Sequence, residues 1–338
     1  MFIVRSVNNS DIDSLYELSS LVTFINLPHD REIITALVNS SVRSFNSPDK
    51  DKSKNYYLFV LEDLNEKKIV GASLIHAQHG TDDIPHFFFK VSKIEKFSET
   101  INTGFIHGTL KLDYEPNGYS EIGGLVIHPN YRGHKEKLGK FLSFVRFLYM
   151  SSNPHLFTKE VHSELMPPLD QNGKSPLWEA IGRKFVNMEY FEADKLSRTN
   201  KEFILNLFPL ELIYESLLPP AARDSIGKVN KDTIPVKNML EKIGFKYTYE
   251  VDPFDGGPHY RATLAQLSII KNMYQGKVNF ESMDNSFEKR IIITIPSKEY
   301  AFKAIQTNAK TKNLKKELTI PLELKEKLND KNINAIII

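Results

Sequence analysis

A short cationic loop between a strand and a helix is the part of this sequence best suited to chemistry. Residues 122–127 form an apolar run that predicts a strand, and His128-Pro129-Asn130 ends it. Residues 132–137 read Arg-Gly-His-Lys-Glu-Lys, and from Leu138 apolar side chains recur at steps of three and four, which predicts an amphipathic helix. The first amides of a helix lack partners and its dipole is positive there, so this arrangement can bind a phosphate group. The alternative is a solvated basic turn in an ordinary strand–helix unit.

The strand before this loop carries a second unusual feature, the adjacent glycines Gly123 and Gly124. Paired glycines inside a strand indicate a β-bulge or a place where another molecule approaches the backbone closely. We therefore expect the ladder of hydrogen bonds to be interrupted here.

Composition excludes several classes of function. The 338 residues include 44 lysines and arginines against 42 acidic residues, and a net charge of +2 gives no general attraction to nucleic acid. There is no cysteine, which excludes disulfides, thiolate nucleophiles and cysteine-ligated zinc. No apolar run is long enough to span a bilayer, and the first residues have no signal-peptide pattern. We expect a protein of the cytoplasm, without a membrane partner.

The elements that must position the loop are predicted from hydrophobic periodicity and turn residues. Strands are expected at residues 2–7, 86–114 (two runs), 157–165 and 245–251, and an antiparallel hairpin at 56–63 and 69–80. Helices are expected at residues 12–21, 30–45, 177–185, 235–243 and 264–273. His76 and His79 would point to opposite faces of a strand, so they are a poor pair for a shared metal ion.

The chain changes character beyond Gly276, where short strand signals dominate. These signals lie at residues 289–297, 315–324 and 334–338, with a lysine-rich link at 308–316. We expect an α/β (α+β) chain with one large domain, residues 1–275, that contains an insertion at about 167–232. Residues 276–338 would form a small β-rich C-terminal subdomain.

Five stretches together resemble the arginine N-succinyltransferase family, which has a GNAT-like acyl-CoA N-acyltransferase fold. They are EIGGLVIHPNYRGH (121–134), LGKFLSFVRFLYM (138–150), GKSPLWEAIGRKF (173–185), IPVKNMLEKIGFKY (234–247) and VDPFDGGP (251–258). The resemblance runs nearly end to end. It implies a mixed sheet with helices on both faces and transfer of a succinyl group from succinyl-CoA to the α-amino group of L-arginine, in arginine catabolism. Ornithine is a second substrate that the resemblance suggests.

The resemblance also assigns positions. Leu125 matches a position that the family assigns to succinyl-CoA. The pyrophosphate would lie against the amides of residues 133–139, which include Gly133, Leu138 and Gly139. Further charge would come from four side chains: Arg132, Lys135, Lys137 and Lys140.

Two departures from the family pattern concern the site. The general acyltransferase loop pattern is matched only by its last glycine, Gly139, and Lys137 stands where another glycine is usual. The catalytic histidine of the family lies shortly before the helix at 235–243, and Asn230 occupies that position here. Asparagine cannot accept a proton at any useful pH, so the base is elsewhere, water relays the proton, or the activity is altered.

Acyl transfer to an amine needs a base and a polarised carbonyl. Glu121 and Glu164, on the strands before and after the helix that starts at Leu138, are the expected bases, with His128 and His162 as alternatives. A histidine beside a proline turn is more often structural. The backbone N–H groups of Leu125 or Val126 would polarise the carbonyl.

Charged residues elsewhere suggest how the ligands are held. Asp252 and Asp255 would bind the arginine guanidinium, with an Asx turn as the alternative reading. The succinyl carboxylate would bind a cation, and the candidates are Arg146, Arg183 and Arg261. The sequence does not decide among them. The single tryptophan, Trp178, is expected in the core.

No metal and no permanently bound cofactor are expected, and succinyl-CoA enters as a co-substrate. Two alternative functions stay open: a related acyltransferase with another amine or acyl-CoA, and a non-catalytic acyl-CoA-binding protein. A homo-oligomer is left open.

Overall fold

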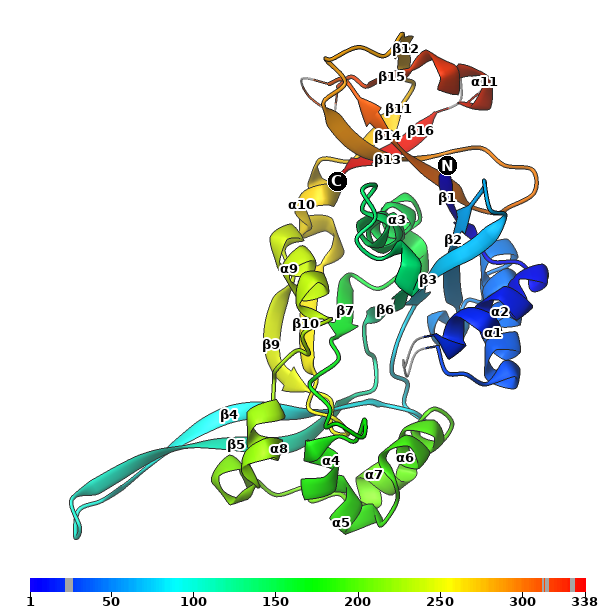
Figure 1. Ribbon diagram of the computed structural model, residues 1–338. Helices are drawn as coiled ribbons and strands as arrows, with labels where there is room; N and C mark the ends of the chain where they lie inside the picture. The colour runs from blue at the N-terminus through cyan, green and yellow to red at the C-terminus, as the bar shows by residue number, and fades with distance from the viewer. Residues whose placement is uncertain (22–26, 312, 314–315, 329–331) are drawn as a thin grey trace. The chain divides into compact units, whose positions relative to one another are not determined.

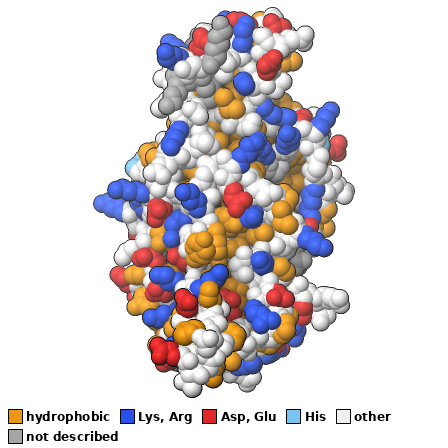
Figure 2. Space-filling model, turned by 90° about the vertical axis from the view of Figure 1, so that its left-hand side faces the viewer, with side chains coloured by type: hydrophobic (Ala, Val, Ile, Leu, Met, Phe, Trp, Pro, Cys, Tyr) orange, Lys and Arg blue, Asp and Glu red, His pale blue; other side chains and the backbone are white. Residues whose placement is uncertain are grey.

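The computed structural model describes residues 1–21, 27–311, 313, 316–328 and 332–338 of the chain. These residues form two compact units (Figure 1). The first unit contains residues 1–78, 120–161 and 263–338, and the second contains residues 79–119 and 162–262. No helix in the described residues is long and apolar enough to cross a membrane. On the face shown in Figure 2, lysine and arginine side chains are interspersed with acidic ones, as the small net charge leads one to expect.

An antiparallel sheet forms the centre of the first unit. Its strands follow the spatial order β11-β16-β13-β14-β1-β2-β3-β6, and every neighbouring pair is antiparallel. The bounds are β1 (Phe2–Ser6), β2 (Tyr56–Asp63), β3 (Lys68–His76), β6 (Ser120–Ile127), β11 (Tyr274–Gly276), β13 (Lys289–Thr294), β14 (Lys303–Ala309) and β16 (Ile333–Ile337). The short strands β12 (Asn279–Glu281) and β15 (Thr319–Pro321) pair in parallel.

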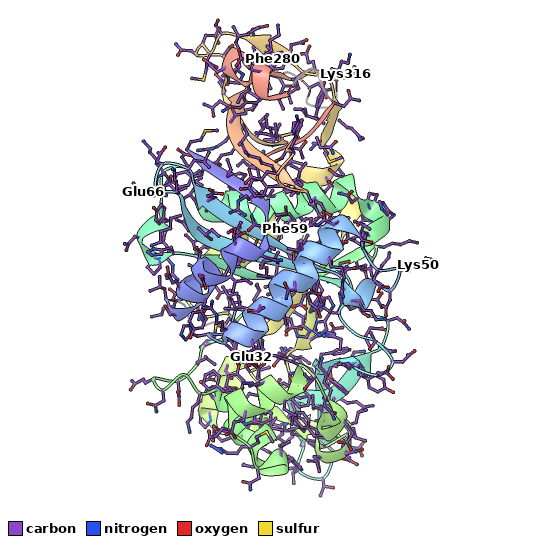
Figure 3. All side chains as sticks on the ribbon, turned by 90° about the vertical axis from the view of Figure 1, so that its right-hand side faces the viewer. Glu32, Lys50, Phe59, Glu66, Phe280 and Lys316 are labelled. Atoms are coloured by element: carbon purple, nitrogen blue, oxygen red, sulfur yellow. The ribbon has the colours of Figure 1, made fainter. Side chains whose placement is uncertain are left out.

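Two helices cover one face of this sheet, α1 (Ile12–Ser20) and α2 (Arg31–Asn46), and both stand in front of it in Figure 3. The Asp30 side chain caps α2 by accepting from the amides of Glu32 and Ile33. Ile34 and Val38 of α2 are fully buried in a cluster with Leu58 and Val60 of β2. Each such side chain stabilises the fold by roughly 1.5–3 kcal/mol.

The opposite face of the sheet is covered by α3 (Leu138–Ser152). Side chains alternate along a strand, so the residues of β2 next to Leu58 and Val60 point to this face. Tyr57 and Phe59 of β2 both contact the ring of Tyr149 of α3. Every residue from 141 to 150 is buried, so α3 is the central helix of this unit. The remaining helices of the unit are α10 (Ser268–Lys271) and α11 (Lys325–Leu328).

The second unit has its own antiparallel strands, in the order β10-β9-β4-β5-β8. They are β4 (His86–Ser98), β5 (Thr103–Glu115), β8 (Ile213–Tyr214), β9 (Lys246–Val251) and β10 (Pro258–Thr263); β7 (Glu160–Glu164) leads into this unit. The helices are α4 (Pro176–Ala180), α5 (Gly182–Val186), α6 (Tyr190–Ser197), α7 (Glu202–Leu207), α8 (Pro220–Ser225) and α9 (Ile234–Ile243). The β4–β5 hairpin projects as a long arm (Figure 1).

Most predicted elements are confirmed, and the α/β class with helices on both faces of the sheet is confirmed as well. The order strand–helix–helix–hairpin, followed later by strand, basic loop and helix, is the GNAT-like order that was expected. The C-terminal run 334–338 is a buried strand, β16, paired between β11 and β13.

Three predictions of secondary structure are wrong. Residues 177–185 are not one helix, because the chain breaks at Ile181 and Gly182; a Cβ at Gly182 would lie 2.2 Å from the Trp178 ring. Residues 264–273 contain only a short 3-10 turn and the four-residue helix α10. Of the predicted strand at 315–324, Lys315 lies outside the described residues, and only β15 is a strand within 316–324. The strands β10 and β14 were not predicted.

The strands beyond Gly276 extend the sheet of the first unit, and Ile291 and Ile305 share a buried cluster with Ile3 of β1. The two compact units therefore divide the chain differently from the expected domains, 1–275 and 276–338, which stay a prediction.

A buried ion pair at the start of the chain gives a test of this fold. Arg5 of β1 donates to both carboxylate oxygens of Asp11, at 2.7 and 2.9 Å, and to Glu62 of β2 at 2.6 Å. The Arg5 and Asp11 side chains are 5% and 6% exposed. Arg5→Met would leave Asp11 buried and unpaired, so we expect the free energy of unfolding to fall by about 3–5 kcal/mol in urea denaturation.

The matched control is Arg31→Met, because Arg31 pairs with Asp13 at side-chain exposures of 58% and 75%. We expect this variant to lose less than about 1 kcal/mol. Equal losses in the two variants would contradict the role given to Arg5.

Candidate active site

The expected interruption in β6 is present as a β-bulge. Ala72 of β3 pairs with Val126 and Leu74 pairs with Gly123, so Gly124 and Leu125 together face the single residue Ser73. Gly124 has φ +55°, a left-handed conformation that glycine adopts without strain. The bulge leaves an extra backbone amide outside the regular ladder, on the strand that leads to the cationic loop.

Arg146 of α3 holds this bulge from inside the first unit. Its guanidinium donates to the carbonyl oxygen of Gly123 at 3.0 Å and to the hydroxyl of Ser143 at 2.9 Å. The residue is 2% exposed, and burial lowers the pKa of Arg146 to about 9. A guanidinium so placed serves the backbone of β6 and is not available to a succinyl carboxylate.

The other two arginines predicted for that carboxylate also have partners. Arg183 pairs with Glu179 at 2.8 Å and with Glu189. Arg261 pairs with Glu250 at 2.5 Å, and its guanidinium lies 3.7 Å from the centre of the Tyr119 ring. None of the three is singled out as the binding residue.

The cationic loop is open to solvent. Arg132, Gly133, Lys135 and Lys137 are exposed, whereas Leu138 is buried and anchors the helix start. Lys137 adopts a left-handed conformation, φ 50°, directly before α3, and Gly133 has φ +70°. The first amides of a helix have no acceptor four residues back within it; of those in α3, the amide of Lys140 donates to the carbonyl oxygen of Lys137 at 2.9 Å. An anion can therefore reach the loop and the helix N-terminus together.

Glu136 is the one acidic side chain of this loop, and it is turned to other partners. Gln306 of β14 donates to its backbone and side-chain oxygens at 2.9 and 3.2 Å, and Arg290 of β13 lies 3.8 Å away. Its negative charge is thus partly neutralised before an anion binds.

Glu121, one of the two predicted bases, lies on β6 three residues before Gly124 of the bulge. It is the cross-strand partner of His76, which in turn is the partner of Tyr56. Burial and the charge of Glu121 raise the pKa of Tyr56 to about 12. His76 stacks on Tyr56, and its Nε2 lies 2.7 Å from the carbonyl oxygen of Ser53, so this nitrogen carries the proton.

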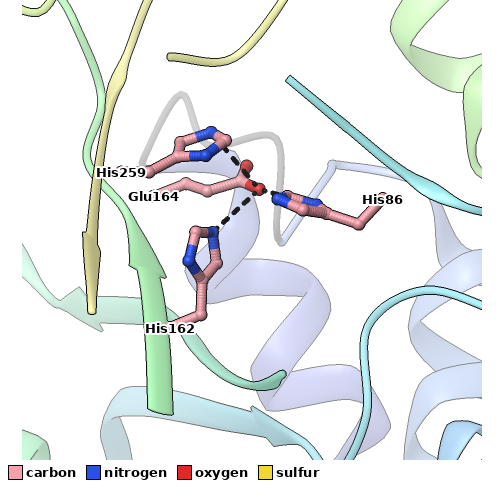
Figure 4. Close-up of side chains that lie close together, drawn as sticks. All are labelled: His86, His162, Glu164 and His259. Atoms are coloured by element: carbon pink, nitrogen blue, oxygen red, sulfur yellow. Dashed lines mark hydrogen bonds and ion pairs between the residues drawn. The ribbon is translucent and has the colours of Figure 1, made fainter. Parts of the chain in front are cut away.

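Glu164, the other predicted base, lies among three histidines of the second unit (Figure 4). Its Oε1 is 3.4 Å from Nε2 of His162, 3.6 Å from Nδ1 of His86 and 3.8 Å from Nε2 of His259. His86 begins β4, His162 and Glu164 belong to β7, and His259 belongs to β10. We call these four residues the histidine cluster.

The electrostatics of the histidine cluster lower the pKa of two of its groups. Burial raises the pKa of Glu164, but the hydrogen bond from His162 and the charges of His259 and His162 outweigh it and hold the pKa well below its usual range. Burial and the neighbouring histidines hold the pKa of His86 well below its usual value. The cluster therefore combines an ionised carboxylate with a neutral His86.

A row of further side chains supports the cluster. Nδ1 of His259 lies 3.9 Å from Oε2 of Glu250, the carboxylate that Arg261 binds. Burial would raise the pKa of Glu250, but His259 and Arg261 lower it to about 2. The Tyr119 ring stacks on His162 with ring centres 5.8 Å apart.

Asp252 and Asp255 form the Asx turns that were the alternative reading. Oδ1 of Asp252 accepts from the amides of Phe254 and Asp255, and Oδ1 of Asp255 accepts from the amide of Gly257. Burial and the charge of Glu164 raise the pKa of Asp252 to about 7. Asp255 is buried, with the Tyr190 hydroxyl 3.3 Å from its other oxygen. Both carboxylates hold the loop before β10; their binding of a guanidinium stays a prediction.

Other predicted site residues have structural roles. The Nδ1 atom of His128 accepts from the amide of Asn130 at 3.2 Å and caps a 3-10 turn. Trp178 is fully buried, stacks on Phe254 at 5.0 Å and donates to the carbonyl oxygen of Met188, so its placement in the core is confirmed.

Sequence reasoning missed His86 and His259 as functional candidates. Their separation from Glu164 along the chain leaves no local spacing pattern, and only pairing of strands brings them together. The one available signal was the position of each at the start of a strand after proline or glycine, Pro85-His86 and Gly257-Pro258-His259.

Asn230, at the position of the expected catalytic histidine, caps the turn before α9. Its Oδ1 accepts from the amides of Asp232 and Thr233, at 2.7 and 3.1 Å. We expect Asn230→Ala to lower the free energy of unfolding by about 1 kcal/mol, as loss of a helix cap does, and Asn230→Asp to preserve it. Urea denaturation of the three proteins measures this, and equal stability of all three would show that the cap contributes nothing.

Comparisons with known proteins identify the family. A family model described as "Arginine N-succinyltransferase beta subunit" matches residues 2–269. An arginine N-succinyltransferase of Yersinia pestis (strain Pestoides F) is 32% identical over 327 residues, which cover 94% of this chain and 92% of the relative. An arginine N-succinyltransferase of Yersinia enterocolitica is 34% identical over 287 residues, covering 84% and 82%.

A solved structure shows the same fold. It is the arginine/ornithine succinyltransferase subunit AI from Pseudomonas aeruginosa, with a TM-score of 0.84 and 24% identity over 100% of this chain and 98% of that chain. The resemblance seen in the five sequence stretches is thus confirmed over nearly the whole length. The chain belongs to the arginine N-succinyltransferase family of acyltransferases.

Proposed function

We propose that this protein transfers the succinyl group of succinyl-CoA to the α-amino group of L-arginine. The observation that carries the proposal is the first unit's combination of an open cationic helix start with a bulged strand directly before it. Membership of the family supports the choice of acyl donor and amine. Ornithine, which the name of the Pseudomonas aeruginosa structure includes, is the second amine to examine.

The loop would hold the pyrophosphate of the co-substrate. Amides among residues 133–139 would donate to the phosphate oxygens, although those of Glu136 and Lys137 already donate to His134. Positive charge would be added by Arg132, Lys135, Lys137 and Lys140. The N–H groups of Leu125 or Val126, at and after the bulge, would donate to the thioester oxygen as negative charge develops on it.

The reaction forms one bond and breaks another. The neutral amine nitrogen attacks the carbonyl carbon, a C–N bond forms, and the C–S bond breaks to release the CoA thiolate, which takes up a proton. The amine gives one proton to a base. We favour Glu121 for this role because it lies on the bulged strand itself. Glu164 is the weaker candidate, since the histidines that surround it hold its pKa low.

The remaining roles are proposals of the same kind. Asp252, which is less buried than Asp255, would be the partner of the arginine guanidinium. Phe97, Ile101, Phe105 and Ile106 are each more than half exposed near the end of the β4–β5 arm, which suits a contact with a second copy of the chain. Light scattering would show whether a homo-oligomer forms. We place the protein in the cytoplasm.

Release of free CoA tests the proposed reaction. The chain has no cysteine, so a thiol reagent reports only the CoA released. Turnover with arginine supports the proposal, and turnover only with another amine supports a related acyltransferase. Tight binding of succinyl-CoA without turnover on any amine would instead indicate a non-catalytic acyl-CoA-binding protein.

The base is tested by comparing Glu121→Gln with Glu164→Gln. Loss of a general base lowers kcat by about 10²–10⁴-fold, and we expect this loss in Glu121→Gln with little change in KM for succinyl-CoA. The measurement is steady-state CoA release by both variants over roughly pH 6–9, a range that includes the titration of the substrate amine. A large loss of kcat confined to Glu164→Gln would transfer the role to that residue.

Charge in the loop is tested by Lys135→Ala and Lys137→Ala. Each removes an exposed cation that would contact phosphate, so we expect KM for succinyl-CoA to rise about five- to tenfold while kcat changes little. The matched control is Lys50→Ala, an exposed lysine outside the loop (Figure 3). Unchanged KM in both loop variants would argue that CoA binds elsewhere.

A further inference from the structure

We propose that His86, His162, His259 and Glu164 bind one divalent transition-metal ion, with Zn²⁺ as the best fit. Their ligand atoms all lie within 4.8 Å of one another, in the interior of the second unit (Figure 4). The sequence analysis predicts no metal site and considers only His76 and His79, which are a poor pair for one. The inference shares Glu164 with the proposed succinyl transfer, as the weaker candidate for the base, so its tests measure metal binding and not turnover.

The spacing of the donors is close to that of a bound ion. Zinc bonds to imidazole nitrogen are about 2.0–2.1 Å long, so ligand atoms of a tetrahedral site lie about 3.4 Å apart. The observed distances from Oε1 of Glu164 to the three nitrogens are 3.4, 3.6 and 3.8 Å. Shifts of a few tenths of an ångström would bring these three contacts to the spacing of a zinc site.

The burial of the rings needs an explanation that a metal ion supplies. His86, His162 and His259 are 2%, 1% and 0% exposed. Neither ring nitrogen of His259 is within hydrogen-bond range of a partner in the described residues, although Nε2 faces the carboxylate. Buried polar atoms without partners are rare and destabilising. Coordination would satisfy Nε2 of His259.

A carboxylate stands behind one of these ligands, as it does in many metal sites. Nδ1 of His259 points to Glu250 at 3.9 Å, and Arg261 holds Glu250 at 2.5 Å. A histidine bound to metal through one nitrogen commonly donates its other N–H to a carboxylate, which fixes the ring and strengthens the ligand. Binding at Nε2 would place the proton of His259 on Nδ1, facing Glu250.

The donor set selects the kind of ion. Three imidazole nitrogens and one carboxylate oxygen suit zinc and its neighbours in the first transition series, whereas Ca²⁺ and Mg²⁺ require oxygen ligands. Four protein ligands make a closed site, which is typical of structural zinc. The ion would therefore hold together the starts of β4 and β10 and the end of β7, three segments far apart in the sequence.

Metal content measures the site directly. The full chain is stripped with a chelator, dialysed against Zn²⁺ and analysed by mass spectrometry and by calorimetric titration; we expect about one ion per chain. Co²⁺ in place of Zn²⁺ should give the intense visible absorption of a tetrahedral site. The melting temperature should rise with Zn²⁺ concentration, because the ion binds the folded state.

Variants locate the ion. His86→Gln and His259→Gln each remove one ligand, and we expect the Kd for Zn²⁺ to rise by at least about 100-fold. His155→Gln, an exposed histidine elsewhere in the chain, is the matched control and should keep the wild-type Kd. Circular dichroism of each metal-free variant shows whether it folds. If a variant does not fold, the titration of the wild-type protein still tests the proposal.

The result that would overturn the proposal is a wild-type protein that takes up less than about a tenth of an equivalent of Zn²⁺ or Co²⁺ at micromolar concentrations. Uptake that survives both histidine variants would equally overturn it, by placing the ion elsewhere. None of these measurements involves turnover, so failure of the metal proposal can be distinguished from failure of the proposed succinyl transfer.

Discussion

The bulge in β6 is the constraint on which the first unit's chemistry depends. In a regular ladder every amide of β6 that faces β3 would donate across to it, and the bulge at Gly124 and Leu125 interrupts this pattern. The bulge is possible because Gly124 takes a left-handed conformation and because the buried Arg146 satisfies the carbonyl oxygen of Gly123. A buried cation is costly, so its hydrogen bonds to this strand tie the shape of the backbone to the packing of α3.

The same two elements, β6 and α3, also position the cationic loop. β6 ends and α3 begins within a few residues of it, and Leu138 anchors the helix while Lys135 and Lys137 remain exposed. The left-handed Lys137 lets the chain turn directly into the helix, with no side-chain cap occupying the first amides. Lysines at this end of a helix oppose its dipole, and a bound anion would relieve that conflict.

The second unit concentrates buried charge in a different way. Glu164 remains ionised because three imidazole rings surround it. Glu250 remains ionised because His259 and Arg261 lower its pKa. Asp252 and Asp255, which lack such partners, have raised pKa values and serve the backbone of a tight loop. Carboxyl groups of one unit thus have pKa values shifted in opposite directions, and their neighbours decide which.

The sequence alone was sufficient for what depends on local patterns. Most of the longer strands, the helix that starts at Leu138, the glycine bulge and the cationic loop follow from periodicity and turn residues, and motifs spread along the chain identified the family. It did not reveal the break at Gly182, the strand β10 or the partner of Arg146, because each is set by contacts between distant residues. The histidine cluster is the clearest case: His86, His162 and His259 come from three separate strands, and only their pairing in the folded second unit places them around one carboxylate.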